Sequence, residues 1–167
     1  MSIILGNLHY PGNAVMTYAH LSTGTHIVIG DGKKALILIN EGTATSPVLT
    51  VETVLHQKNA SNQAMGTDRP GRVFASVGPR SGSAEPTDWH QLAEDRFAHE
   101  IIAGLVKLAE REKLKKLVIV APARTLAELR RAMPDDFTKL IAAEIVKDLT
   151  KHSIPSIAQH LMAELAA

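Results

Sequence analysis

The sequence predicts an α/β domain built on a mixed sheet of about five strands. Three short apolar runs rich in β-branched residues come first, between residues 26 and 57, with only turns between them. Two later apolar runs alternate with segments whose apolar residues recur every three or four positions. Strands joined by tight turns pair antiparallel, whereas strands joined through helices pair in parallel. We therefore predict a three-stranded meander, a long helix, and then strand, helix, strand and helix.

Short-range signals mark the first three strands. His26 begins the run HIVIG, the tripeptide DGK follows as a turn, and KALILIN ends at Asn40, as in a β-hairpin. After a break of glycine and proline, the run VLTVETVLHQ alternates and predicts a half-buried third strand. The residues expected on one face of that strand are Leu49, Val51, Thr53 and Leu55.

A long helix is predicted from Thr87 to about Glu112, with Thr87 as its N-cap. Trp89 shares the apolar stripe of Leu92 and Phe97, so we expect it to pack in the core and anchor the helix, although an aromatic could also stack on a nucleobase. The stripe continues through Ile101, Leu105 and Leu108. The run REKLKK at 111–116 could be a basic patch for phosphate, but its cations alternate with Glu112 and Leu114 at a helix end, which favours solvated side chains.

A buried strand and a second helix follow. LVIVA at 117–121 is a continuous apolar run closed by proline, which is typical of a strand buried on both faces. The next helix, at 123–133, is ended by Pro134. Its apolar face would carry Leu126, Leu129 and Met133, and the residues expected to face water are Glu128, Arg130 and Arg131.

The last two elements depend on context as well as pattern. LIAAEIVKD at 140–148 fits a strand or a helix, and the alternating order of elements favours a strand. The segment of Lys147, Asp148 and Thr150 fits either a site or a strand-to-helix turn. A final helix follows, with Ser153 and Pro155 suited to its start.

The chain has 167 residues, which suits one domain with a core of its own. We assign residues 1–25 to an N-terminal arm or an early-start extension, with Met16 as an alternative to Met1, and residues 26–167 to the domain. There is no cysteine, which excludes disulfides and cysteine-ligated zinc. The first residues do not resemble an export signal and no run approaches about 20 apolar residues, so we expect a cytoplasmic protein that spans no membrane.

The polar segment at 58–86 carries the strongest functional signal. Three of its arginines lie among glycines: Arg69, Arg72 and Arg80. Gly71 and Gly82 would let backbone amides approach a ligand, and arginine presents a rigid fork of donors to phosphate. Because the net charge is only +1, nucleic-acid binding would depend on this cluster, and no DNA sequence specificity is expected. The alternative is a surface loop kept soluble by its arginines.

An enzyme would need a cluster of reactive side chains. The best local candidate is Asp88, His90 and Asp95 at the start of the long helix, with Asp31 from the first hairpin. His90 and Glu94 are four positions apart and share a helix face, so they could act as acid and base or bind a metal. Such pairs are also common on solvated faces, and the chain contains no HExxH, nucleophile elbow, P-loop or dinucleotide fingerprint. We therefore expect no cofactor and no metal.

Several separated motifs resemble one bacterial family. They are DGKKA at 31–35, DRPGRVF at 68–74, TDWH with AEDRFA within 87–98, LVIVAP at 117–122 and EIVKDLTK at 144–151. In this order they are similar to the host attachment protein family, also called proteins required for attachment to host cells. The resemblance runs from about His26 to the C-terminus. It implies a role in attachment, either directly or through an indirect intracellular effect.

That family in turn resembles the middle domain of archaeal and eukaryotic class I translation release factors, which has a ribonuclease-H-like fold. Those factors carry a Gly-Gly-Gln loop before a long helix with an Arg-Phe pair, and this chain has Arg96-Phe97 after its glycine-rich segment. The glutamine is absent from Gly78-Pro79-Arg80-Ser81-Gly82, so the resemblance does not carry over peptidyl-tRNA hydrolysis. It implies a translation-linked or RNA-linked role, with the ribosome or an RNA as the partner.

We therefore predict a cytoplasmic binding protein, not an enzyme, that contacts RNA phosphates through its Gly/Arg-rich segment. Two alternatives stay open. One is a hydrolase that uses Asp88, His90 and Asp95, and the other is a protein-interaction module for attachment to host cells.

Overall fold

The computed structural model describes residues 20–58, 89–111 and 114–165. Its strands are β1 (His26–Gly30), β2 (Lys34–Asn40), β3 (Leu49–His56), β4 (Leu117–Ala121) and β5 (Ile141–Val146). Its helices are α2 (Trp89–Arg111), α3 (Ala123–Ala132), α4 (Asp135–Thr138) and α5 (Ile154–Leu165). The predicted strands and the three predicted helices are confirmed. The short helix α4, which follows Pro134, is not predicted.

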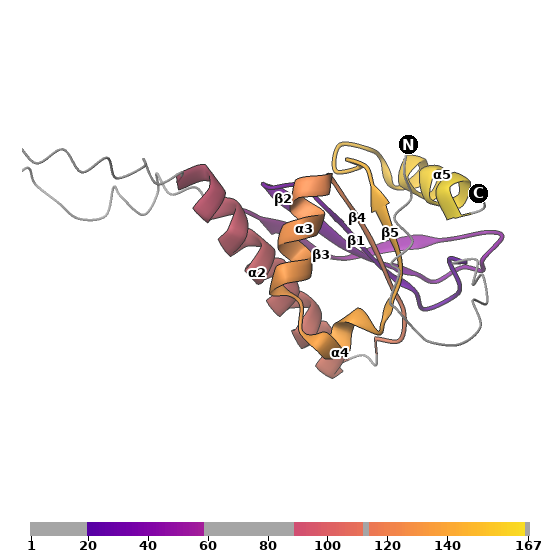
Figure 1. The fold of residues 1–167 in the computed structure, drawn as a ribbon. Helices are drawn as coiled ribbons and strands as arrows, with labels where there is room; N and C mark the ends of the chain where they lie inside the picture. Colours follow the sequence, from indigo (N-terminus) through magenta and orange to yellow (C-terminus); the bar gives the residue numbers. More distant parts are fainter. Residues whose placement is uncertain (1–19, 59–88, 112–113, 166–167) are drawn as a thin grey trace, which may run out of the picture.

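The five strands form one sheet in the order β3-β2-β1-β4-β5 (Figure 1). β1, β2 and β3 pair antiparallel in a meander, whereas β1 with β4 and β4 with β5 pair in parallel. This confirms the predicted mixed sheet, including the strand at β5 for which the residue pattern alone was ambiguous. It also agrees with the ribonuclease-H-like arrangement that the resemblance implied.

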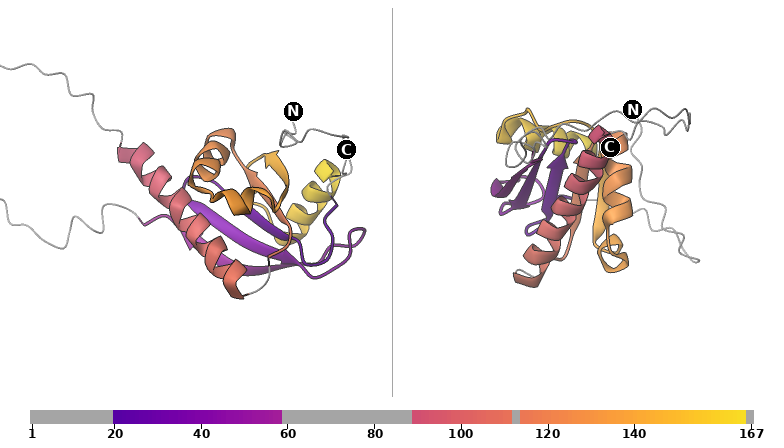
Figure 2. Two further views of the ribbon diagram at one scale, coloured as in Figure 1. Left: turned by 60° about the horizontal axis from the view of Figure 1, so that its bottom comes forward. Right: turned by 90° about the vertical axis from the view of Figure 1, so that its left-hand side faces the viewer.

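The sheet is covered on both faces. Helices α2 and α3 pack on one face and α5 packs on the other, so that the sheet lies between them (Figure 2). Successive residues of β1 alternate between the two faces: Val28 packs beneath α2 and α3, while Ile27 and Ile29 pack on the α5 side. Because both faces are buried, the central strands carry apolar residues throughout.

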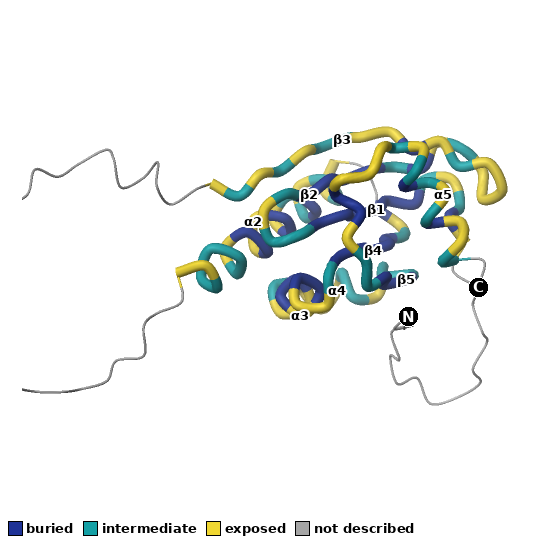
Figure 3. The backbone as a smooth tube through the Cα atoms, turned by 90° about the horizontal axis from the view of Figure 1, so that it is seen from above, coloured by how far each residue is buried: buried dark blue, intermediate teal, exposed yellow. Residues whose placement is uncertain are grey.

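The edge strand β3 contains a bulge that changes the faces predicted for its side chains. The pairing with β2 is interrupted at Glu52, which is an extra residue in β3. One extra residue reverses the alternation beyond it, so Leu55 packs on the α2 side and Leu49 on the α5 side. The prediction that Leu49, Val51, Thr53 and Leu55 share a face is therefore wrong. Many residues along β3 are exposed to solvent (Figure 3). The exposed fraction of Val51, for example, is 39 %.

Two predictions of burial are also wrong. Trp89 was expected in the core but is 72 % exposed, because the first turn of α2 projects past the sheet (Figure 2). Glu128 was expected to face water but is only 3 % exposed. Its Oε1 accepts a hydrogen bond of 3.0 Å from Nε2 of Gln91, so this carboxylate is part of the contact between α3 and α2.

An ion pair joins α3 to the edge strand β5. Glu144 in β5 is buried, and Nε of Arg130 lies 3.0 Å from both of its carboxylate oxygens. The hydrogen bond to Glu144 raises the pKa of Arg130 although partial burial lowers it. Arg130 is exposed as predicted, and its charge also neutralises a carboxylate beneath α3.

Asn40, at the end of β2, is fully buried and holds two loops together. Its Nδ2 donates a hydrogen bond of 2.6 Å to the main-chain oxygen of Leu21, in the segment before β1. Its Oδ1 accepts hydrogen bonds of 3.0 Å from the main-chain N–H groups of Gly42 and Val48, which bracket the turn before β3. One side chain thus satisfies three backbone groups that no strand pairs.

We predict that Asn40→Ala lowers the free energy of unfolding by about 2–3 kcal/mol, because three buried or partly buried backbone groups lose their hydrogen-bond partner. Chemical denaturation followed by circular dichroism would measure the change. Gln159→Ala, an exposed position on α5, is the control and should change stability by less than about 0.5 kcal/mol. An Asn40→Ala variant as stable as this control would show that Asn40 does not organise these loops.

Candidate functional site

The Gly/Arg-rich segment begins and ends at one edge of the sheet. We call this the carboxyl edge: it is formed by the turn after β1, the segment after β5, and the first turns of α2 and α3 (Figure 1). Gln57, just after β3, donates its N–H to the main-chain oxygen of Lys33 at 2.8 Å. A Cβ at Gly32 would lie 3.0 Å from Cγ of Glu94 in α2, so the helix start is packed against the same turn.

The proposed ligand-binding residues Arg69, Gly71, Arg72, Arg80 and Gly82 lie outside the described residues, as do Thr87 and Asp88. Their roles stay predictions. The structure does describe the two ends of the segment, Lys58 after β3 and Trp89 at the start of α2, and both side chains are exposed. Both ends of the segment therefore lie at the carboxyl edge.

Asp31 is the central acceptor of this edge. Its Oδ1 accepts the main-chain N–H groups of Lys33 and Lys34 at 2.7 Å each, which fixes the turn between β1 and β2. Its Oδ2 accepts a hydrogen bond of 2.9 Å from Oγ1 of Thr150, which lies after β5. Oγ1 of Thr150 is also 2.7 Å from Oδ1 of Asp148. A single threonine hydroxyl thus lies between two carboxylates from distant parts of the chain.

From the sequence, the segment of Asp148 and Thr150 fitted either a site or a turn. The structure shows a turn that is hydrogen-bonded to Asp31 through Thr150. The N–H of Thr150 donates 3.0 Å to Oδ1 of Asp148, closing a local loop. The signal that could have found the contact is topological. Asp31 and Asp148 both follow strands of the parallel part of the sheet, and such strands end at the same edge.

The hydrogen bonds keep Asp31 ionised. Partial burial raises the pKa of Asp31, but the N–H donors of Lys33 and Lys34, the Thr150 hydroxyl and the charge of Lys151 outweigh it. The net result is a pKa below the ordinary value of 3.8. The carboxylate form is favoured in the folded state, so its stabilisation is complete above that ordinary value and is lost as the pH falls below it.

A polar contact ties the start of α2 to the start of α3. Nε of Arg124 lies 3.2 Å from Oε2 of Glu94 and 3.4 Å from Oε1 of Glu128. Arg124 also donates to Oε1 of Gln91 through its terminal nitrogen. The guanidinium is about half exposed, so it remains accessible at the carboxyl edge while it holds the two helices together.

Of the predicted hydrolase cluster, the structure describes His90 and Asp95. His90 is exposed, and Asp95, five positions along α2, lies about 140° away around the helix. Asp95 accepts a hydrogen bond of 3.4 Å from Gln91, and Glu94 is paired with Arg124. Within residues 20–58, 89–111 and 114–165 no three His, Asp or Glu side chains are placed to hold a metal ion. The cluster stays a prediction, because Asp88 lies outside these residues.

The described side chains that are accessible at the carboxyl edge include an aromatic ring and several basic groups. Trp89 is exposed where the Gly/Arg-rich segment meets α2. Exposed basic side chains from four other places line the same edge: Lys33, Lys58, Arg124 and Lys151. Among the described carboxylates at this edge, those of Asp31 and Glu94 are engaged in internal contacts. Such a surface suits a polyanion that also offers a flat ring.

A family model described as bacterial archaeo-eukaryotic release factor family 12 matches residues 24–161, which is most of the chain. No curated protein matches. The match confirms the predicted similarity to release factors, and the similarity to host attachment proteins stays a prediction. None of the described helices is long and apolar enough to cross a membrane.

We predict that Asp31→Asn lowers the free energy of unfolding by about 1 kcal/mol at pH 7, since the amide cannot accept the Thr150 hydrogen bond as the carboxylate does. The difference from wild type should shrink as the pH falls below 3.8, where Asp31 of the wild type loses its advantage. Urea unfolding at several pH values would measure both effects. Asp136→Asn, at a side chain 94 % exposed, should behave as wild type. A difference that does not change with pH would contradict this account.

Proposed function

The chain belongs to bacterial archaeo-eukaryotic release factor family 12, and from this premise we propose that it is an RNA- or ribosome-associated binding protein. In this proposal the segment at 58–86 contacts RNA phosphates through Arg69, Arg72 and Arg80. Gly71 and Gly82 let the backbone approach the ligand. The protein acts in the cytoplasm, where ribosomes are present.

The observation that carries the proposal is the exposure of Trp89. A large aromatic side chain is costly to leave in water, and this one is 72 % exposed at the point where the arginine-rich segment enters α2. An indole ring in this position can stack on a nucleobase of any sequence, while arginine forks hold the neighbouring phosphates. The combination of stacking and phosphate contacts is typical of single-stranded RNA binding without sequence readout.

The frame that supports this surface is fixed. Phe97, Ile101 and Leu105 bury one side of α2 against the sheet, and Arg124 ties its first turns to α3. The opposite end of the segment leaves from β3, which is held to the turn at Lys33. A ligand gripped between these anchors would be held against a rigid edge, which reduces the cost of ordering on binding.

The proposed role is binding and not release of the nascent chain. Where the Gly-Gly-Gln motif would be expected, the chain reads Gly78-Pro79-Arg80-Ser81-Gly82. The glutamine of that motif is therefore absent, and in this proposal Arg80 binds phosphate instead. Docking on RNA through the retained fold does not require that glutamine, because the fold and the chemistry of a site are separable.

One observation favours a second candidate, a protein-interaction module for attachment to host cells. Three valines are exposed along or beside the edge strand β3: Val48, Val51 and Val54. An exposed apolar edge strand is a typical place for another protein chain to bind. In this case the valines, and not the arginines, would determine binding to the partner.

We predict that the protein binds a fluorescein-labelled single-stranded RNA with an affinity that falls with salt. Three neutralised phosphates give a slope of log affinity on log salt of roughly −2 to −3. The Arg69/Arg72/Arg80→Ala variant should lose most of this slope, whereas Trp89→Ala should reduce affinity by about 5- to 100-fold with the slope unchanged. Fluorescence anisotropy across a salt series would measure both quantities.

A matched control removes three exposed cations elsewhere, in the Lys107/Arg131/Lys139→Ala variant. It should keep the wild-type slope within about 0.5. Equal losses in both triple variants would mean that binding reflects net charge alone, and salt-independent binding would contradict phosphate contact. A Val51→Thr/Val54→Thr variant should bind RNA as wild type does, and loss of binding in that variant alone would favour the second candidate.

A further inference from the structure

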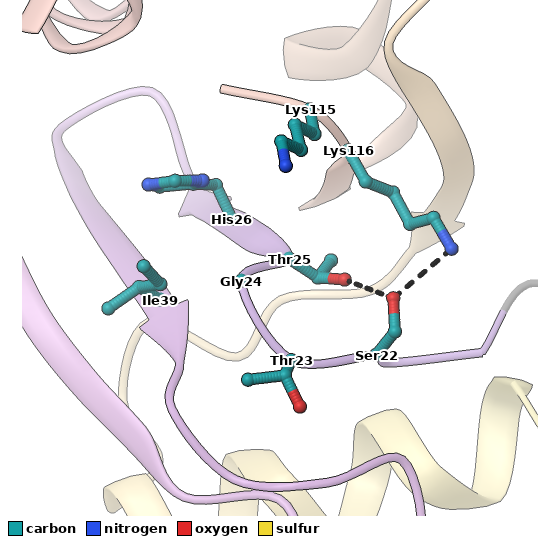
Figure 4. A pocket seen from close by; sticks show the side chains of 8 residues that line it. All are labelled: Ser22, Thr23, Gly24, Thr25, His26, Ile39, Lys115 and Lys116. Carbon is teal, nitrogen blue, oxygen red and sulfur yellow. Dashed lines mark hydrogen bonds between the residues drawn. The ribbon is translucent and has the colours of Figure 1, made fainter. Parts of the chain in front are cut away.

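An open hollow of about 450 Å³ lies at the end of the sheet opposite the carboxyl edge (Figure 4). Its wall is the turn of residues 22–25 together with Lys115 and Lys116, which precede β4, and its apolar side is formed by Ile39 and the ring of His26. The residues come from three separate stretches of the chain. None of them belongs to the carboxyl edge, so the hollow is a separate place on the molecule.

The turn that forms the hollow has a fixed shape. Gly24 has a φ of +79°, a conformation that residues with a Cβ rarely adopt, and its N–H donates 2.7 Å to the main-chain oxygen of Asn40. Thr25 donates its N–H to Ser22 at 3.1 Å, and His26 donates its N–H to the oxygen of Lys116 at 2.9 Å. The lysine segment is thus fastened to the turn through the backbone.

The hollow is rich in donors and cations. Nζ of Lys116 donates 3.2 Å to Oγ of Ser22, which is in turn 3.2 Å from Oγ1 of Thr25 (Figure 4). Lys115 is exposed and lies beside Lys116. Within the described part of the chain neither lysine forms an ion pair with a carboxylate. The two side chains point in different directions: Lys116 points toward Ser22, and Lys115 points away from it, on the side of His26 (Figure 4). Because no described carboxylate neutralises either ammonium group, both add to a local positive potential that attracts an anion.

The opposite side of the hollow is apolar and aromatic. Ile39 is half-buried, and the ring of His26 is 3 % exposed and lies 3.4 Å from Glu52 through its Nε2. Glu52, the carboxylate nearest to His26, is therefore engaged by the histidine and is not placed to neutralise the lysines. A hollow of this volume is in the range that holds a small molecule, with a few polar groups that orient it.

We propose that this hollow binds a small phosphorylated ligand of mononucleotide size. Its phosphate would accept hydrogen bonds from Lys116 and from the hydroxyl groups of Ser22 and Thr25, and the charge of Lys115 would strengthen the attraction. Its uncharged part would rest on the side of Ile39 and His26. The proposal does not depend on the RNA-binding role of the carboxyl edge, because it uses other residues at the other end of the strands.

Isothermal titration calorimetry of the full chain with adenosine 5′-monophosphate, and separately with inorganic phosphate, tests the proposal. We expect saturable binding of the nucleotide that is tighter than that of phosphate alone. The Lys115→Gln/Lys116→Gln variant should lose at least ~10-fold in affinity, since the charge-assisted hydrogen bond of Lys116 and the nearby charge of Lys115 are both removed. Ser22→Ala should lose roughly 3- to 10-fold. Lys107→Gln/Lys139→Gln, with the same change in net charge at exposed sites, should bind within about 2-fold of wild type.

Amide chemical shifts locate the ligand even if one variant is poorly folded. Nucleotide should shift the amides of Ser22, Gly24 and Lys116 and leave those of Glu94 and Thr150 at the carboxyl edge unchanged. Three results would overturn the proposal: no saturable binding by wild type, equal losses in the two lysine pairs, or shifts confined to the carboxyl edge. Binding of an RNA oligonucleotide at the hollow without binding of the mononucleotide would also overturn it.

Discussion

Burial of the central strands on both faces is the constraint on which the rest of this structure depends. Every residue of β1 and β4 is buried, so the middle of the sheet has no face left for polar chemistry. Helices must cover both sides, and α2 with α3 and α5 do so. Accessible charged groups are therefore confined to the ends of the strands and to the outer elements. Both candidate binding surfaces lie where this constraint places them.

Charged side chains are arranged differently at the two ends of the strands. At the carboxyl edge the carboxylates serve the fold: Asp31 fixes a turn and accepts from Thr150, while Glu94 accepts Arg124 and so joins α2 to α3. These contacts hold the ends of the Gly/Arg-rich segment and leave cations and Trp89 exposed around them. At the opposite end two lysines face a hydroxyl-lined hollow. Both ends thus present positive charge. At the carboxyl edge the carboxylates of Asp31 and Glu94 are engaged, and at the hollow no described acid pairs with the lysines.

The sequence predicted those features that depend on local pattern and on the order of elements. The buried face of α3, with Leu126 and Leu129, followed from helical spacing, and β5 followed from alternation with the helices. Periodicity identified the stripe of α2 that contains Trp89. It contained no information on how far the sheet extends beneath the helix, and the first turn lies beyond that support.

Features that depend on tertiary contact were missed. The extra residue Glu52 reverses the faces of β3, and nothing in an alternating run shows where a bulge lies. The hydrogen bond between Asp31 and Thr150 joins residues 119 positions apart, so only the topology of the sheet brings them together. Lys115 is exposed as expected, but the contact of Lys116 with Ser22 was missed, because Ser22 is distant in the sequence.

Sedimentation of the purified protein with ribosomes tests the central claim most directly. Wild type and the Arg69/Arg72/Arg80→Ala variant would be compared at low and at physiological salt. The account predicts that the wild type co-sediments at low salt, less so at physiological salt, and that the variant stays in the supernatant at both. A wild type that does not co-sediment at low salt, or a variant that co-sediments equally well, would contradict it.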